Sequence, residues 1–149
     1  MNTPFVRPLA ARLPLLVLCA LVSLGLGTRA HAQVAVIANN SVSASDISHS
    51  DLHDLFTGSA SSIKGSGEVS PVLLKSSSTH EEFLNKYIGK SDAAFRAGWR
   101  SLLFSGQNTI PKTFASDAEV VDYVAHTRGA VGYIAASSPH PGVKTLAVR

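Results

Sequence analysis

Cysteine is almost absent from this sequence, and its scarcity excludes two kinds of chemistry. The single cysteine, Cys19, lies inside an apolar run at residues 13–26. A chain with one cysteine forms no internal disulfide and has no multi-cysteine metal site. A lipid-modified cysteine would follow a small residue at the end of the apolar run, whereas Cys19 follows Leu18 within it, so lipidation is not predicted.

Clustered charge of one sign is also missing. The formal net charge of +3 comes from 13 Lys+Arg and 10 Asp+Glu. Three of the cations, Arg7, Arg12 and Arg29, precede Gln33, so the rest of the chain has ten charges of each sign. A neutral chain without a Lys/Arg cluster is not expected to bind nucleic acid.

Sequence motifs of common hydrolases are missing too. There is no Gly-x-Ser-x-Gly segment, and His80 lacks the second histidine of a His-Glu-x-x-His metal helix. His49 and His53 lie four residues apart, but no third or fourth ligand accompanies them, so a solvated helix face is the better interpretation. We therefore expect a protein that is not an enzyme and needs no metal or cofactor.

The first 32 residues have the pattern of a cleavable signal peptide. Two arginines precede the apolar run, which is shorter than the roughly 20 residues that span a bilayer. Ala30-His31-Ala32 supplies the small residues that signal peptidase requires. We expect a periplasmic protein without stable membrane insertion, in which residues 33–149 form one domain.

Strand and helix patterns alternate along residues 33–149. Apolar runs predict four strands, at residues 34–38, 69–74, 130–134 and 143–148. Polar caps and closing glycines predict four helices, at residues 48–58, 79–89, 91–106 and 116–129. Pro71 restricts the second strand to a sheet edge or a bulge. This order predicts an α/β fold with a mixed, mostly parallel sheet flanked by helices.

The third predicted helix has an apolar stripe at helical spacing: Phe95, Trp99, Leu102 and Leu103. If Phe95 and Trp99 were exposed, this aromatic pair could form a platform for recognition of a ligand. Such a stripe is more typical of a helix face that packs on the core, so Trp99 is expected to be buried.

Hydroxyl side chains gather where the second strand leads into a helix, at Ser76, Ser77, Ser78 and Thr79. A helix N-terminus presents unpaired N–H groups and the positive end of the macrodipole, which together suit an oxyanion such as phosphate. Alternatively, these residues are ordinary N-caps, with Ser78 paired to Glu81 and Thr79 to Glu82, in a polar loop. The two glutamates weaken the case for a strong anion site.

A second polar loop follows the first strand and contains Ser41. Ligands of open α/β sheets bind beyond the carboxyl ends of strands, so this loop could face the serine cluster. The candidate ligand-binding residues are therefore Ser41, Lys75, Ser77, Ser78 and Thr79.

Four segments resemble the substrate-binding proteins of ABC-type phosphate importers. Residues 40–58 resemble the Leu-Ser-x-x-x-Leu-x-x-Ile-Phe-x-Gly segment that begins the second lobe of those proteins. Ser77 to Phe83 stands where the family has Ser-Gly-Thr-x-x-x-Phe, and Gly129 to Tyr133 is similar to its Gly-x-Ile-Gly-Tyr strand. Residues 99–111 resemble a small single-lobe branch of the same superfamily.

The resemblance implies a single lobe of the type 2 periplasmic-binding-protein fold that binds phosphate or a similar oxyanion for an ABC-type uptake system. Ser77, Ser78 and Thr79 would donate hydrogen bonds, Ser41 would contribute from the opposite loop, and Lys75 would supply distant charge. An ABC permease, or a second lobe from another chain, would be the partner.

Three features depart from the family. Its first lobe is absent, the glycine of Ser-Gly-Thr is Ser78, and the phosphate-binding arginine ahead of that motif has no match. An accessory or interaction module that keeps the fold but has lost its ligand is the alternative.

We predict that the exported protein begins at Gln33, because Ala30 and Ala32 fit the cleavage pattern. N-terminal sequencing of the protein recovered from the periplasm tests this. A start at a lipid-bearing Cys19 would contradict the cleavage site.

Overall fold

The computed structural model describes residues 33–149, and the predicted signal peptide, residues 1–32, lies outside the described residues. The strands are β1 (Val34–Ala38), β2 (Asp46–Ile47), β3 (Ser62–Ile63), β4 (Ser66–Glu68), β5 (Ser70–Pro71), β6 (Leu73–Leu74), β7 (Thr113–Phe114), β8 (Ala130–Ala135) and β9 (Lys144–Val148). The helices are α1 (His49–Thr57), α2 (Ser78–Phe83), the π-helix η1 (Leu84–Ile88), α3 (Asp92–Phe104) and α4 (Asp117–His126).

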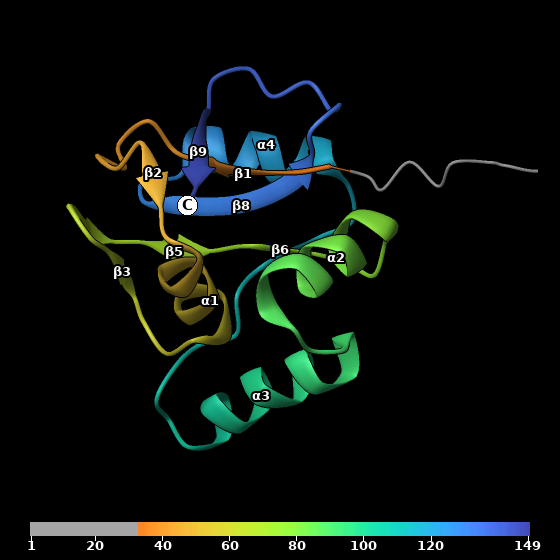
Figure 1. Ribbon diagram of the computed structural model, residues 1–149. Helices are drawn as coiled ribbons and strands as arrows, with labels where there is room; N and C mark the ends of the chain where they lie inside the picture. The colour runs from red at the N-terminus through yellow and green to blue at the C-terminus, as the bar shows by residue number, and fades with distance from the viewer. Residues whose placement is uncertain (1–32) are drawn as a thin grey trace, which may run out of the picture. The chain divides into compact units, whose positions relative to one another are not determined.

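Five strands form one mixed sheet in the order β2-β9-β1-β8-β5 (Figure 1). β1 runs antiparallel to both of its neighbours, β8 and β9, whereas β2 with β9 and β5 with β8 are parallel pairs. The predicted mixed sheet is confirmed. The expected predominance of parallel pairing is wrong, because the long central strand β1 runs opposite to the strands on either side of it.

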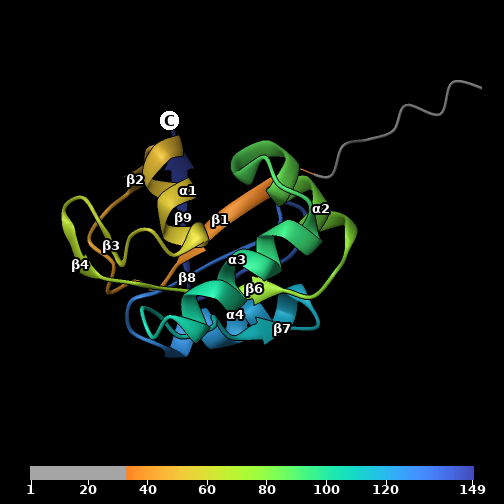
Figure 2. The same ribbon diagram turned by 90° about the horizontal axis from the view of Figure 1, so that it is seen from below.

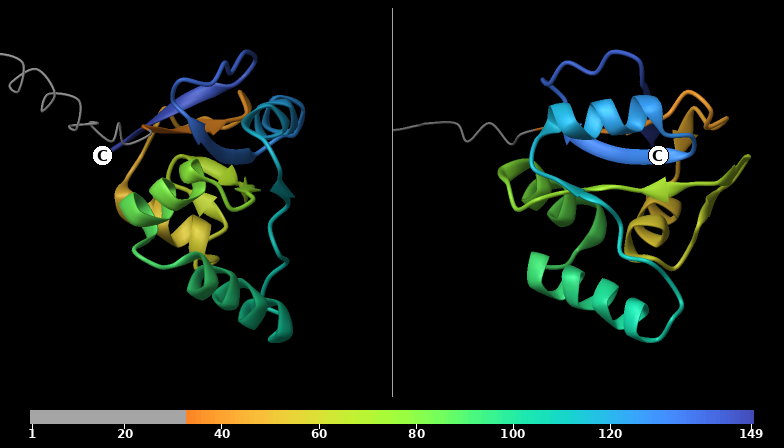
Figure 3. Two further views of the ribbon diagram at one scale, coloured as in Figure 1. Left: turned by 90° about the vertical axis from the view of Figure 1, so that its right-hand side faces the viewer. Right: turned by 180° about the vertical axis from the view of Figure 1, so that it is seen from behind.

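Alternate residues of β8 face two different helical layers, as the two-residue period of a strand requires. A Cβ atom on Gly132 would lie 2.8 Å from Val120 of α4. The next residue, Tyr133, stacks on Phe83 of α2 with ring centroids 3.8 Å apart and meets the edge of Phe56 of α1 at 5.6 Å. The sheet is therefore a middle layer, with α4 on one face and α1 and α2 on the other (Figure 3).

The local helix signals are largely confirmed. Three predicted serine caps accept a backbone N–H at the starts of α1, α3 and α4: Ser48, Ser91 and Ser116. Gly58 and Gly89 close their helices in the left-handed region, with φ of 81° and 70°. The helix after β6 starts one residue earlier than predicted, because Ser77, and not Ser78 or Thr79, is its N-cap.

The strand predicted at residues 69–74 is divided into β5 and β6. β5 lies at the edge of the five-stranded sheet, as Pro71 predicts, because an edge strand tolerates a missing backbone donor. β6 pairs in parallel with β7 in a separate two-stranded sheet. Residues 59–68, where the sequence predicts neither a strand nor a helix, contain the antiparallel pair β3 and β4.

Helix α3 packs beside α1 (Figure 2), and Figure 1 shows it at some distance from the five-stranded sheet. Trp99 is buried, as predicted, and its Nε1–H donates to the Phe56 carbonyl at 2.9 Å. Leu103, predicted on the inner stripe, is 43% exposed. Phe95, Trp99 and Leu102 already define the inward face at spacings of four and three residues, and Leu103 lies about 100° further round the helix.

We predict opposite effects of alanine at two glycines. Gly132→Ala should lower the free energy of unfolding by about 1–3 kcal/mol, because its Cβ meets Val120 at 2.8 Å in a packed layer. Gly98→Ala on α3 should raise it by about 0.5–1 kcal/mol, because nothing lies within 4 Å and alanine is the better helix former. Urea unfolding monitored by circular dichroism measures both, and equal effects would contradict the packing of α4 on β8.

Candidate functional site

The turn that joins β6 to α2, residues 75–79, lies at the molecular surface, and we refer to it as the serine turn. Four of its side chains are exposed: Lys75, Ser76, Ser77 and Ser78. Thr79 is buried, with 8% of its surface exposed. The Lys75 N–H donates to the Phe114 carbonyl of β7 at 2.8 Å, which holds the start of the turn in place.

Several donors of this turn have no partner within residues 33–149. The backbone N–H groups of Ser78 and Thr79 have no backbone acceptor, as expected in the first turn of a helix. Their hydroxyl groups and the Lys75 ammonium likewise make no hydrogen bond or ion pair in this range. The Ser77 hydroxyl accepts the His80 N–H at 3.2 Å, which leaves its own proton free to donate.

Beneath the turn, His80 is fully buried and links three elements. Its Nδ1 lies 2.5 Å from Tyr133 Oη of β8, and its Nε2 lies 2.8 Å from Asp92 Oδ1 of α3. A carboxylate only accepts, so we assign a proton to Nε2. Tyr133 Oη already accepts the Leu74 N–H at 3.1 Å, so its hydroxyl proton points to Nδ1.

Asp92, the first residue of α3, connects this buried chain to the surface. Its Oδ2 accepts a hydrogen bond from the Ser76 hydroxyl at 3.0 Å. Its Oδ1 also accepts from Arg96 Nε at 2.8 Å. The terminal nitrogens of Arg96 have no partner in the described part of the chain. A guanidinium with free donors therefore lies two hydrogen bonds away from Ser76.

The surroundings of Tyr133 and Asp92 set their ionisation. Burial raises the pKa of the Tyr133 hydroxyl well above its usual 10, so the phenol keeps its proton. Partial burial would raise the pKa of Asp92. The hydrogen bonds from its three partners outweigh that effect and hold this pKa below its usual 3.8. The hydrogen-bonded series of side chains thus has the Tyr133 phenol at its buried end and the Asp92 carboxylate at its surface end.

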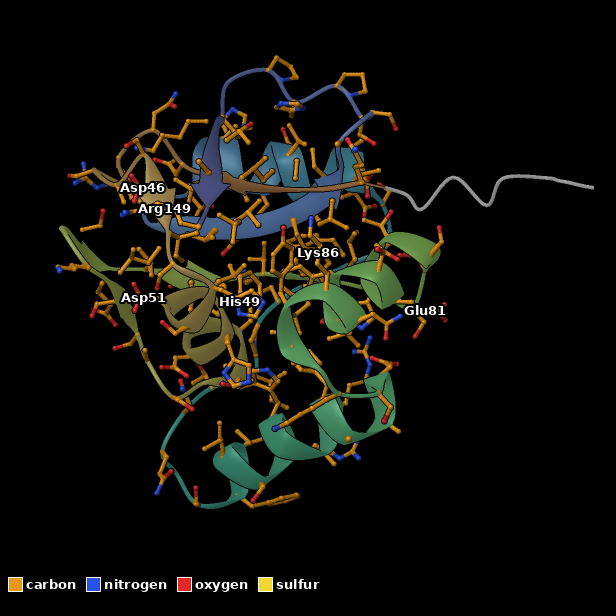
Figure 4. All side chains as sticks on the ribbon, in the orientation of Figure 1. Asp46, His49, Asp51, Glu81, Lys86 and Arg149 are labelled. Atoms are coloured by element: carbon orange, nitrogen blue, oxygen red, sulfur yellow. The ribbon has the colours of Figure 1, made fainter. Side chains whose placement is uncertain are left out.

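Cations and acids both lie on or beside the turn. Lys75 is on the turn and Arg96 approaches it through Asp92, while Glu81 is exposed on the first turn of α2 (Figure 4) and Glu82 follows it on the same helix. These charges leave no excess of positive charge, so the site offers directed N–H and O–H donors instead of a strong positive field. Such donors suit a small oxyanion.

The structure does not bring Ser41 to this turn. Ser41 Oγ accepts the Gly129 N–H at 3.0 Å, immediately before β8 begins. The serine turn follows β6, on a segment that runs in the same direction as β8. The six residues of β8, at about 3.3 Å each, separate the two loops by about 20 Å, so the loops lie at opposite ends of this strand. The expectation that the two loops face one another fails, because β1 is antiparallel to β8.

His49 and His53 are engaged separately. His49 Nε2 lies 3.1 Å from the Lys86 carbonyl, and His53 Nδ1 lies 3.2 Å from Asp54 Oδ1. Among residues 33–149 no three metal-ligating side chains come together. In the same range no helix is long and apolar enough to cross a membrane.

Sequence reasoning missed the residues that support the turn, namely His80, Asp92 and Arg96. Tyr133 carried a signal, because it belongs to the Gly-x-Ile-Gly-Tyr resemblance. Asp92 and Arg96 reach the turn from another helix, and no local pattern indicates that contact.

Comparison with known proteins gives a structural likeness only. No protein-family profile and no curated protein sequence matches the chain. A structure from Clostridium perfringens, described as a phosphate ABC transporter substrate-binding protein with bound phosphate, is 18% identical at a TM-score of 0.61. An ABC-type phosphate transport receptor from Vibrio cholerae is 14% identical at 0.51, and PstS from Borrelia burgdorferi is 16% identical at 0.57.

The chain shares its fold with part of these binding proteins. The matches cover 77–78% of this chain but only 44–47% of theirs, so it spans less than half of their length. The predicted α/β architecture and its likeness to one lobe of phosphate-binding proteins are therefore confirmed at the level of fold.

We predict that Asp92 contributes to the acid sensitivity of the fold. Its pKa is lower in the folded than in the unfolded chain, so the ionised carboxylate stabilises the fold above about pH 3.8, and that contribution disappears as the pH falls through the folded-state pKa. Asp92→Asn should be less stable than the parent at pH 7 and should lose less stability on acidification. Thermal unfolding from pH 7 to pH 2 measures this, with Asp122→Asn on the exposed face of α4 as the control. Parallel pH profiles for the parent and Asp92→Asn would contradict it.

Proposed function

We propose that this protein binds phosphate or a similar oxyanion at the turn formed by residues 75–79. The observation that carries the proposal is the set of unpartnered donors there: the N–H and hydroxyl groups of Ser78 and Thr79 at the start of α2. Ser77 adds a hydroxyl proton, and Lys75 and Arg96 add positive charge beside the turn.

In this proposal Arg96 takes the place of the arginine that the phosphate-binding family carries ahead of its Ser-Gly-Thr motif. The hydrogen bonds from Arg96 and Ser76 to Asp92 orient the guanidinium at the edge of the turn. Its free terminal nitrogens can then bind one oxyanion through two parallel hydrogen bonds, as a guanidinium does with phosphate. Ser41 has no part in this site.

Two observations support binding over catalysis. The structure from Clostridium perfringens, which shares the fold, holds phosphate and is described as a substrate-binding protein. In this chain, both ring nitrogens of His80 are occupied by Tyr133 and Asp92, and the ring is fully buried. It therefore has no free nitrogen with which to activate a hydroxyl nucleophile.

We further propose that the protein works in the periplasm, after removal of residues 1–32, as the substrate-binding part of an ABC-type uptake system. The exposed turn provides one side of a binding cleft. A permease, or a second lobe from another chain, would supply the other side.

An accessory module without a ligand is the second candidate. Two observations favour it: Asp92 and Glu81 bring negative charge to the turn, and Ser77 serves as a helix cap. A module of this kind would keep the buried network for stability alone.

We predict that Arg96→Gln weakens phosphate binding by about tenfold to a hundredfold, because a hydrogen bond to a charged ligand is worth about 1.5–3 kcal/mol. Ser78→Ala should have a smaller effect in the same direction, because its backbone N–H remains. Isothermal titration calorimetry with phosphate and with sulfate measures both.

Arg100→Gln is the matched control, since Arg100 is exposed one helical turn further along α3, and it should bind like the parent. Circular dichroism of each variant checks that the fold is intact. No heat of binding from the parent at millimolar phosphate would reject the oxyanion proposal and favour the accessory module. Equal weakening in Arg96→Gln and Arg100→Gln would remove Arg96 from the site.

A further inference from the structure

Three large apolar side chains stand exposed in one short stretch of the chain. They are Leu103, Phe104 and Ile110, with exposed fractions of 43%, 86% and 46%. Within residues 33–149 no other large apolar side chain is exposed. We refer to these three residues as the apolar tip. Phe104 is the last residue of α3, the helix that lies farthest from the sheet in Figure 1.

The apolar tip is held in place without being covered. Gly106 turns the chain in the left-handed region, with φ of 69°, and the Gln107 N–H donates to the Leu102 carbonyl at 3.1 Å. Asn108 Nδ2 donates to the Gly58 carbonyl at 3.3 Å, which ties the loop to the end of α1. The loop is therefore fixed to the body of the protein while Phe104 remains in solvent.

The charged residues that neighbour the apolar tip along the sequence are all cations. Residues 93–116 contain Arg96, Arg100 and Lys112 and no acidic residue. Arg100 lies one helical turn before Phe104. Lys112 lies two residues after Ile110, is exposed, and has its ammonium 4.9 Å from the centre of the Tyr123 ring of α4. Glu68 lines the same groove of about 300 Å³ as Ile110 and Lys112, so one acid lies close to these two residues.

We propose that the apolar tip inserts into the interface of an anionic lipid bilayer, with Arg100 and Lys112 against the lipid headgroups. An exposed aromatic ring flanked by cations suits such a surface, because apolar burial of the ring and attraction of the cations to anionic headgroups both contribute to membrane binding. A second copy of the chain is disfavoured, because pairing through the tip would bring the same cations together. A stable protein partner needs a flat or hollow patch of about 800 Å². A projecting helix end is not such a patch, and it suits a deformable bilayer better.

This contact is peripheral. It orients the body of the protein above the membrane through Leu103 and Phe104 at the end of α3 and Ile110 in the loop that follows, and it is independent of the oxyanion proposal. Arg96 is assigned to the serine turn and is not needed at the lipid surface.

A tryptophan placed at the tip tests the proposal. In the chain that begins at Gln33, Phe104→Trp should show a shift of its emission to shorter wavelength with vesicles of phosphatidylcholine containing 30% phosphatidylglycerol, and no shift with phosphatidylcholine alone. Trp99 is buried and provides a constant background in the parent. Ser137→Trp, at an exposed turn after β8, is the control for vesicle contact by other parts of the chain and should not shift.

The cations are tested in the Phe104→Trp background. Arg100→Gln with Lys112→Gln should lower the partition coefficient about tenfold or more, whereas Lys64→Gln with Arg128→Gln, two exposed cations on other elements, should change it by less than about twofold. Absence of any shift with anionic vesicles would overturn the proposal and leave an acidic protein surface as the partner of the tip. Equal shifts with both lipid compositions, or an equal shift of Ser137→Trp, would overturn it as well.

Discussion

The hydrogen-bonded chain from Tyr133 through His80 to Asp92 is the constraint on which the candidate site depends. It lies where β6, α2, β8 and α3 meet, and every polar atom in it is paired. A buried polar group that loses its partner costs about 1–3 kcal/mol, so the network allows one arrangement of these four elements. The serine turn is therefore presented by a rigid support, although the turn itself is exposed.

This support also explains how a chain with balanced charge can offer an anion site. Asp92 accepts hydrogen bonds from Arg96 and Ser76, so the carboxylate holds a guanidinium at the turn while neutralising part of its charge. The remaining attraction for an anion comes from directed donors, the free N–H and hydroxyl groups at the start of α2. An open site of this kind is expected to bind weakly until another surface closes it, because water competes for exposed donors.

The apolar tip and the serine turn lie towards opposite ends of α3. Asp92 and Arg96 at its start support the turn, while Leu103 and Phe104 at its end are exposed. The inward face of the same helix is fixed by Trp99, whose ring packs against the Gly58 turn and whose Nε1–H binds the Phe56 carbonyl. One helix thus connects the proposed ligand site with the proposed membrane contact.

The sequence by itself determined the local features: three serine caps, the glycine ends at Gly58 and Gly89, the edge position of Pro71 and the burial of Trp99. These depend on residues within a few positions of each other, so their patterns are readable along the chain. Strand direction was decided only by the tertiary structure. Because β1 runs antiparallel to β8, Ser41 lies at the opposite end of β8 from the serine turn. The contacts of His80 and Ser76 with Asp92 likewise depend on how α2 and α3 pack, whereas Arg96 pairs with Asp92 within α3. Packing follows from the summed fit of distant side chains, for which no single segment carries a signal.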